Sequence, residues 1–515
     1  MGDRVTATVL GPGADGGGVD HLPLVAVAAA VTGLVAAGAL PAWAGLAHHV
    51  ALPPLDLFAD VRVLLAEAPS YPWFVVGLVA SVALRSLALA VMLGSLDRPA
   101  MARTAAFYGA AVVPALVAGV LGFAAVAVVY ALFLWTAVGL AVAAVLALGP
   151  LPWRGWRWHA GARWVVVGYL AALLVVSLAS ALGTDLVQVG LVWVSAGLSA
   201  VVVLRLSGRG RGPRPWARAR PVVVAMVALA AVAPAPAAPP LPASVERAPA
   251  REGTLFLVPG IGASSGTSTM FRLEPAALGF DCAQTVYFSY AGRGAGAPQR
   301  SARCPITRGA PYVAEHTHRP MAELAATFRA QIADLAPPVV VVAHSQGGWV
   351  AASALGDTPD PAVHTVVLVG AFPRHQHGYV LDGTGAGLVG TDGMEALTAA
   401  LRGAGATSFD PRAPLPREYL GTTGAVADLM ADGFPRHVQV VTMTGALDLP
   451  VMGADWRLDG ATDLCPVYVD HGGLITSREV HRSIDRVLDG RGQAGCGWWR
   501  RWPALAFTAF GVPPP

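Results

Sequence analysis

Ser345 lies at the centre of Ala343-His-Ser-Gln-Gly347, the stretch whose residue types could best carry out covalent chemistry. The four valines of Val339–Val342 precede it, and an unbroken apolar run of this length predicts a strand buried on both faces. A helix is predicted over Trp349–Leu355. A serine on such a tight strand-to-helix turn holds its hydroxyl above the sheet edge, and the N–H of Gln346 points toward a developing oxyanion. The alternative is an ordinary Ser/Gly turn, which the valine strand and the helix disfavour.

A serine hydroxyl needs a base to accept its proton, and the base needs a carboxylate to orient it. Asp448 follows the predicted strand Val438–Thr442 after a Gly-containing turn, and it is the predicted acid. His471 follows a short predicted strand, Pro466–Val469, and is the predicted base. Two aspartates in a nearby loop are the alternative acids: Asp455 and Asp459.

Other histidines are less suited to act as the base. His344 adjoins the nucleophile, but neighbouring side chains on that turn point apart, so we expect it to be structural or to face the substrate. His437 precedes a strand and His481 lies on the final helix, and we expect both at the surface. Two His-x-His pairs have no placed carboxylate, so no metal site is predicted there. These pairs are His316 with His318 and His375 with His377.

A glycine-rich turn, Pro259-Gly-Ile-Gly262, follows the predicted strand Thr254–Val258. Glycine tolerates conformations in which backbone N–H groups face a ligand. Together with Ala343-His-Ser-Gln-Gly347 and the chain order serine, aspartate, histidine, this turn resembles the α/β-hydrolase superfamily, especially its compact serine lipases and esterases. Ala343 stands where the family's G-x-S-x-G motif has glycine, and alanine is small enough to allow the close approach of strand and helix.

The resemblance covers the chain from about Gly253 onward and implies a reaction. Ser345 would attack an acyl ester or lipid, His471 would accept the serine proton, and Asp448 would hold the histidine in place. The oxyanion would be bound by backbone N–H groups, those of Gln346 and of Ile261 or Gly262. The resemblance implies no cofactor and no metal. Transfer of the acyl group to an alcohol, instead of to water, would use the same residues.

The elements that must position these residues alternate between strand and helix, which predicts a mostly parallel, doubly wound sheet. Strands are predicted over 254–258, 285–290, 339–344, 365–369, 438–442 and 466–469. A further helix is predicted over Met321–Leu335. The Gly/Pro-rich insertion 372–436 is predicted to form a lid or acyl pocket over the site.

Long apolar runs fill the chain before about residue 238, and 55% of the 515 residues are hydrophobic. After a disordered cytoplasmic leader, residues 1–21, we predict an all-α transmembrane domain over residues 22–238 with about seven spans. The first two spans are each long enough to cross about 30 Å of hydrocarbon. The predicted spans are Leu22–Ala47, Tyr71–Gly94, two within Ala105–Pro150, Trp164–Leu182, Val187–Leu206 and Pro221–Ala238. The last is short, and alternatively ends like a signal peptide.

Arginine clusters orient these spans. They occupy residues 98–103, 154–163 and 205–220, always two spans apart, so they share one side, which the positive-inside rule makes cytoplasmic. The Ala/Pro-rich linker 239–252 then leads to an extracytoplasmic hydrolase domain, residues 253–515, of a multi-pass cell-membrane protein. Arg85 lies within the second span, and no acidic residue is expected at its depth. A charge at this depth marks a function or a partner, and the alternative is that Arg85 reaches water or a backbone carbonyl at a helix interface.

All four cysteines lie in the C-terminal half and lack metal-binding spacing. Proximity in sequence predicts the disulfides Cys282–Cys304 and Cys465–Cys496, with free buried thiols as the alternative. The formal net charge of +3, without a basic patch interleaved with aromatics, disfavours nucleic-acid binding.

Three functional classes follow from these features. A membrane-anchored serine hydrolase accounts for the most residues. A hydrolase-shaped binding or sensory module would lack Asp448 or His471, and both are present. A transporter with an accessory domain has only Arg85 in its favour.

Overall fold

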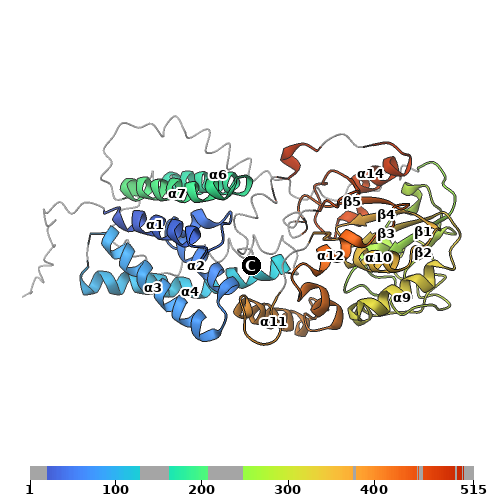
Figure 1. The fold of residues 1–515 in the computed structure, drawn as a ribbon, viewed down its shortest axis with the longest axis horizontal. Helices are drawn as coiled ribbons and strands as arrows, with labels where there is room; N and C mark the ends of the chain where they lie inside the picture. The colour runs from blue at the N-terminus through green and yellow to red at the C-terminus, as the bar shows by residue number, and fades with distance from the viewer. Residues whose placement is uncertain are drawn as a thin grey trace, which may run out of the picture.

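The computed structural model describes residues 20–94, 96–127, 162–206, 248–374, 379–448, 451, 456–492, 496–501 and 503. They form a helical half and a half built on one sheet (Figure 1). Several predicted segments lie outside the described residues: nearly all of the leader 1–21, the second span within Ala105–Pro150, the span Pro221–Ala238 and most of the linker 239–252.

The helical half contains apolar helices of very different lengths. They are α1 (Leu22–Ala36), η1 (Leu46–Val50), α2 (Leu55–Glu67), α3 (Tyr71–Met92), α4 (Arg98–Ala127), α6 (Ala162–Leu182) and α7 (Asp185–Leu206). Within the described residues, four segments are long and apolar enough to cross a membrane: Tyr71–Met92, Arg98–Ala124, Val165–Leu182 and Asp185–Arg205. An N-terminal helical region whose apolar helices fit a membrane domain is therefore confirmed, but the count of about seven spans is not.

The first predicted span is wrong as a single helix over Leu22–Ala47. α1 has 15 residues, about 22 Å at 1.5 Å per residue, and ends at Ala36. Gly38 takes a left-handed φ of 69°, and the N–H groups of Gly38 and Ala39 donate to the carbonyls of Val35 and Leu34. This Schellman arrangement terminates the helix. The chain then turns into η1, all of whose residues are buried.

Arg85 has acidic partners, contrary to the sequence-based expectation. Its Nη2 and Nε donate to the two carboxylate oxygens of Asp60 at 2.7 and 2.9 Å, and its Nη1 lies 3.6 Å from Asp56. Asp56 also accepts a hydrogen bond from Tyr108 at 2.7 Å. Both aspartates lie on α2, which packs against α3 and α4. The burial of α2 therefore brings two carboxylates to the middle of α3.

The other half is organised by a six-stranded, fully parallel sheet of order β2-β1-β3-β4-β5-β6. The strands are β1 (Thr254–Val258), β2 (Thr285–Tyr287), β3 (Val339–His344), β4 (Val363–Val369), β5 (Gln439–Met443) and β6 (Thr462–Asp463). Every residue of β1 and β3 is buried, as the valine run predicts. The predicted parallel α/β architecture is confirmed.

The last strand lies elsewhere than predicted. Pro466–Val469 makes only an isolated bridge between Gly445 and Val467, while β6 forms at Thr462–Asp463. Pro466 has no N–H to donate to a strand neighbour, which disfavours a ladder at this position.

Helices cover both faces of the sheet, with α9, α10 and α12 on one side and α14 on the other (Figure 1). The regular helices are α9 (Met321–Ile332), α10 (Gln346–Asp357), α11 (Leu388–Gly403), α12 (Ala425–Asp432) and α14 (Arg478–Leu488). Short turns are η2 (Thr269–Arg272), η3 (Pro275–Leu278), η4 (Ala314–His318), the π-helical η5 (Pro416–Leu420), η6 (Leu474–Thr476) and η7 (Trp498–Arg500). From the predicted insertion 372–436, α11 contacts α2 and α4 of the helical half (Figure 1).

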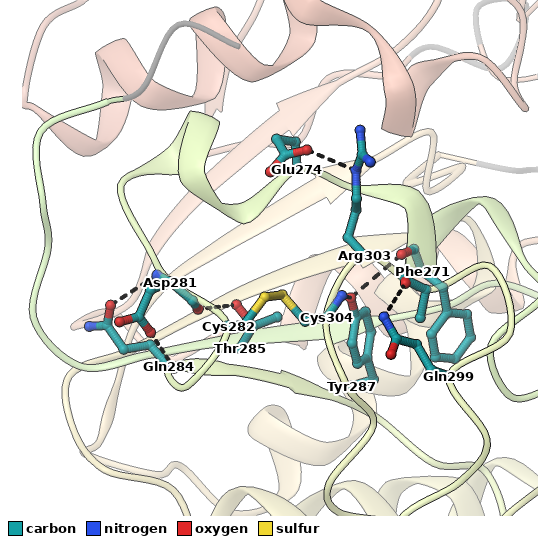
Figure 2. Close-up of a disulfide and its surroundings, with 11 residues drawn as sticks. Phe271, Glu274, Asp281, Cys282, Gln284, Thr285, Tyr287, Gln299, Arg303 and Cys304 are labelled. Atoms are coloured by element: carbon teal, nitrogen blue, oxygen red, sulfur yellow. Dashed lines mark hydrogen bonds and ion pairs between the residues drawn. A yellow bond between two sulfur atoms is a disulfide. The ribbon is translucent and has the colours of Figure 1, made fainter. Parts of the chain in front are cut away.

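Both predicted disulfides are confirmed. Cys282 pairs with Cys304 and Cys465 with Cys496, each at a Cα–Cα distance of 5.2 Å. Figure 2 shows the first, next to Tyr287, whose hydroxyl oxygen accepts the N–H of Cys304 at 3.2 Å. The disulfide therefore ties the loop that ends at Cys304 to the residues just before β2.

Candidate active site

Ser345 occupies a turn that few residues adopt. It follows β3 and precedes α10, with φ 55° and ψ −131°. Such backbone is costly for a non-glycine residue, so its presence points to a functional turn. The turn also requires glycine at position 347, because a Cβ there would lie 2.7 Å from the carbonyl oxygens of Val258 and Pro259. Ala343 is fully buried and pairs with Val258 in the sheet, so alanine suffices where the motif usually has glycine.

His471 and Asp448 are in direct contact. Nδ1 of His471 lies 2.7 Å from Oδ2 of Asp448, and both side chains are buried. Burial lowers the pKa of His471, but the charge of Asp448 and the hydrogen bond to it outweigh burial, so the pKa is raised above 6.5. The alternative acid Asp459 has a side chain that is 97% exposed and pairs with Arg374 instead. Asp455 lies outside the described residues.

His471 also lies beside the nucleophile turn. Its ring and that of His344 have centroids 4.6 Å apart, and Nε2 of His344 lies 3.2 Å from the carbonyl oxygen of His471. Burial lowers the pKa of His344 to about 3, so this neutral ring donates from Nε2 to the carbonyl. The absence of a side chain at Gly370 leaves room for the Asp448–His471 pair, because a Cβ there would lie 3.1 Å from Asp448 Oδ2 and from His471 Cε1. His344 therefore holds the loop that carries His471.

The two oxyanion candidates of the glycine turn differ. The N–H of Gly262 donates to Oγ1 of Thr317 at 2.9 Å, which leaves Ile261 as the turn's candidate donor. The N–H of Gln346 opens α10, where the first backbone N–H groups have no partner within the helix. Thr317 also accepts from the Gln346 side chain at 2.7 Å through its carbonyl. The sequence did not point to Thr317, because this residue belongs to no motif. It links the glycine turn to the nucleophile turn.

Residues from the insertion 372–436 lie over the site. Phe372 packs against His471 with ring centroids 5.7 Å apart, and Tyr419 packs against Trp349 at 6.3 Å. Oγ of Ser408 lies 2.8 Å from the position a Cβ would take on Gly262. The insertion therefore places an aromatic ring against the catalytic histidine candidate and a polar residue against the glycine turn.

The other histidines that the structure describes do not join the site as ligands. His318 is buried against Phe409, and burial lowers its pKa. His481 is buried and Nε2 lies 2.7 Å from the Ile475 carbonyl, so its predicted surface position is wrong; it adjoins the apolar stripe of α14. Among the described residues, no group of three His, Cys, Asp or Glu could hold a metal. His375 and His377 lie outside that part of the chain.

Residues 255–506 match the model of the alpha/beta hydrolase family. This half of the chain is therefore an α/β-hydrolase domain, and the residues placed above all lie within the matched segment. Among solved structures, the chain is similar to an esterase, RhEst1 from Rhodococcus sp. ECU1013, with 18% identity over 48% of this chain and 98% of that chain and a TM-score of 0.26. No curated protein sequence matches the chain.

Proposed function

We propose that the protein is a membrane-anchored serine hydrolase that cleaves acyl esters. The observation that carries the proposal is the buried contact between His471 Nδ1 and Asp448 Oδ2, beside the strained turn of Ser345. A histidine oriented by a buried carboxylate next to a serine on a strand-to-helix turn is the arrangement that activates a hydroxyl for attack. Membership of this domain in a hydrolase family supports the same reaction class.

Each residue has a defined part in the proposed reaction. Asp448 keeps the proton of His471 on Nδ1, so Nε2 can accept the proton of Ser345 while Oγ forms a bond to the ester carbonyl carbon. The N–H groups of Gln346 and Ile261 stabilise the resulting oxyanion. His471 then gives its proton to the leaving alcohol as the carbon–oxygen bond breaks. Water attacks the acyl-serine by the same route and releases the acid.

The membrane attachment and the side of the domain are parts of the same proposal. Four long apolar helices support anchoring in the cell membrane. Two disulfides support an oxidising compartment for residues 253–515, since disulfides are rare in the cytosol. The three arginine clusters support the same orientation.

A membrane-impermeant fluorophosphonate tests the proposal, because such a reagent needs an activated serine and an oxyanion hole. Applied to intact cells, it should form one adduct, on Ser345. Ser345→Ala and His471→Ala should abolish the adduct, and the exposed control Asp459→Asn should keep it. Labelling only after permeabilisation would place the domain in the cytoplasm. No labelling of folded protein in either condition would contradict the hydrolase and favour a binding module.

A further inference from the structure

One helix of the hydrolase half packs very closely against the helical half. Gly387 caps the start of α11, and two further glycines, Gly390 and Gly393, follow at three-residue spacing within the helix. A Cβ on Gly390 would lie 2.7 Å from the Phe123 ring and 2.8 Å from the carbonyl oxygen of Leu65. A Cβ on Gly393 would lie 2.8 Å from Cγ2 of Val120. Glycines at helix spacing allow this close approach, as they do between membrane helices.

Polar and apolar contacts add to this docking. The hydroxyl of Tyr71 donates to Oδ2 of Asp392 at 2.6 Å, although 321 residues separate the two. Val389 is buried in the apolar cluster of α2, α3 and α4, and Phe123 of α4 is buried in the core cluster of the hydrolase half. Each half therefore contributes a side chain to the apolar core of the other.

The docked end of the bundle has the composition of a membrane interface. Tyr71 and Trp73 open α3 with side chains that are largely exposed, and aromatic residues of this kind gather at headgroup level. The docking atoms of Leu65 and Phe123 belong to the last turns of α2 and α4. If the bundle spans a bilayer, α11 lies at the headgroup level of the leaflet on that side.

The other end of α11 leads to the active site. Gly403 ends the helix, Ser408 then lies against Gly262 of the glycine turn, and the ring of Phe409 packs against His318 next to that turn's partner Thr317. Ser345 and His471 are each only 7% exposed. The segment that follows α11 therefore lies against a site whose serine and histidine are nearly closed to water.

We propose that this site takes its substrate from the bilayer, as a lipid-borne acyl ester, and that docked α11 holds the entrance at headgroup level. The inference rests on the proposed serine hydrolase and its membrane anchoring. Moving an acyl chain from hydrocarbon into water costs free energy for every methylene, so an entrance at headgroup level favours a lipid ester. A small water-soluble ester has no long apolar chain to move from the bilayer and gains nothing from the docking.

The test uses the full chain in lipid vesicles with two substrates, a long-chain acyl ester within the bilayer and the soluble ester p-nitrophenyl butyrate. Gly393→Leu inserts a side chain between α11 and Val120. Gly403→Leu is the matched control, since it lies on the same helix with open space around it. We expect Gly393→Leu to lower kcat/KM for the bilayer ester about tenfold or more, while hydrolysis of the soluble ester changes less than about threefold. Gly403→Leu should change neither. Equal loss on both substrates, or no loss on either, would overturn the inference.

A cross-link covers the case in which Gly393→Leu disturbs folding. The Cβ position of Gly393 lies 3.6 Å from Cβ of Val120, within the range of a disulfide. The pair Gly393→Cys and Val120→Cys should cross-link and keep the hydrolysis of the bilayer ester. Failure to cross-link, or loss of that activity on cross-linking, would contradict a docked entrance. If the wild-type protein cleaves only the soluble ester, this inference alone is overturned. If the wild-type protein cleaves neither ester and does not react with the fluorophosphonate, both the proposed function and this inference are overturned.

Discussion

Asp448 accepts the Nδ1–H of His471 at a distance of 2.7 Å, and water reaches neither side chain freely because both are buried. The two residues follow different segments of the chain, β5 and the bridge at Val467. This contact fixes the tautomer that leaves Nε2 of His471 as a proton acceptor.

Asp448→Asn is expected to lower kcat for ester hydrolysis about 10⁴-fold, because the amide favours the wrong histidine tautomer. KM should change little, since the side chain does not touch the substrate. Steady-state kinetics with a soluble ester measure both values. Asp459→Asn, on an exposed side chain, is the control and should match wild type. The reverse pattern would show that Asp459 is the acid.

The pH profile of kcat/KM should show an acid limb above pH 6.5. Burial lowers the pKa of His471, but Asp448 raises it by more, and the base works only when unprotonated. Activity is therefore lost as the pH falls through this raised pKa. His344, whose pKa is lowered to about 3, stays neutral over the same range and adds no second limb. In Asp448→Asn, burial acts without the carboxylate, so the limb should move to lower pH; a limb that stays in place contradicts the assignment.

Replacing both Cys282 and Cys304 by serine is expected to lower the free energy of unfolding by about 3 kcal/mol, the value for a loop of this length in the chain-entropy model. Denaturant unfolding of the purified protein measures the change. The neighbouring Arg303→Gln breaks a half-exposed ion pair with Glu274, shown in Figure 2, and should cost less than about 1 kcal/mol. An equal effect of the two changes would show that the disulfide adds nothing of its own.

Asp60→Asn is expected to destabilise the helical half by about 3 kcal/mol, because it leaves Arg85, whose side chain is only 11% exposed, without its bidentate partner. Thermal unfolding in detergent reports the loss. Asp185→Asn changes an acid in the first turn of α7 and should stay within about 0.5 kcal/mol of wild type. Combining Asp60→Asn with Arg85→Gln should restore part of the stability, since the unpaired charge is gone. Failure to restore any would mean that Arg85 is not the cause.

Thr184→Cys tests the orientation of the bundle. Thr184 lies exposed between α6 and α7, and all four native cysteines are in disulfides. An impermeant thiol reagent should label this variant on intact cells. Arg211→Cys, in the third arginine cluster, should react only after permeabilisation. Labelling of Arg211→Cys alone on intact cells would invert the topology.

The features that the sequence determined are local in the chain. The valine run, Ser345 and the helix after it are consecutive, so their pattern alone predicts a strand, a turn and a helix, and the structure has all three. The disulfides join cysteines 22 and 31 residues apart, and sequence proximity predicted both pairs. The choice of Asp448 and His471 came from chain order in a resembling family, and the structure brings these two side chains together.

Only the tertiary structure decided the contacts between distant segments. An apolar pattern records that a residue is buried but not which residue faces it, so nothing in the sequence paired Arg85 with Asp60 or Gly262 with Thr317. The sequence predicts the glycines of α11 only as part of a Gly/Pro-rich insertion, whereas in the structure Gly390 packs against Phe123. Close approach of two helices is a property of both surfaces together, and their meeting here depends on how the helical and hydrolase halves fold against each other.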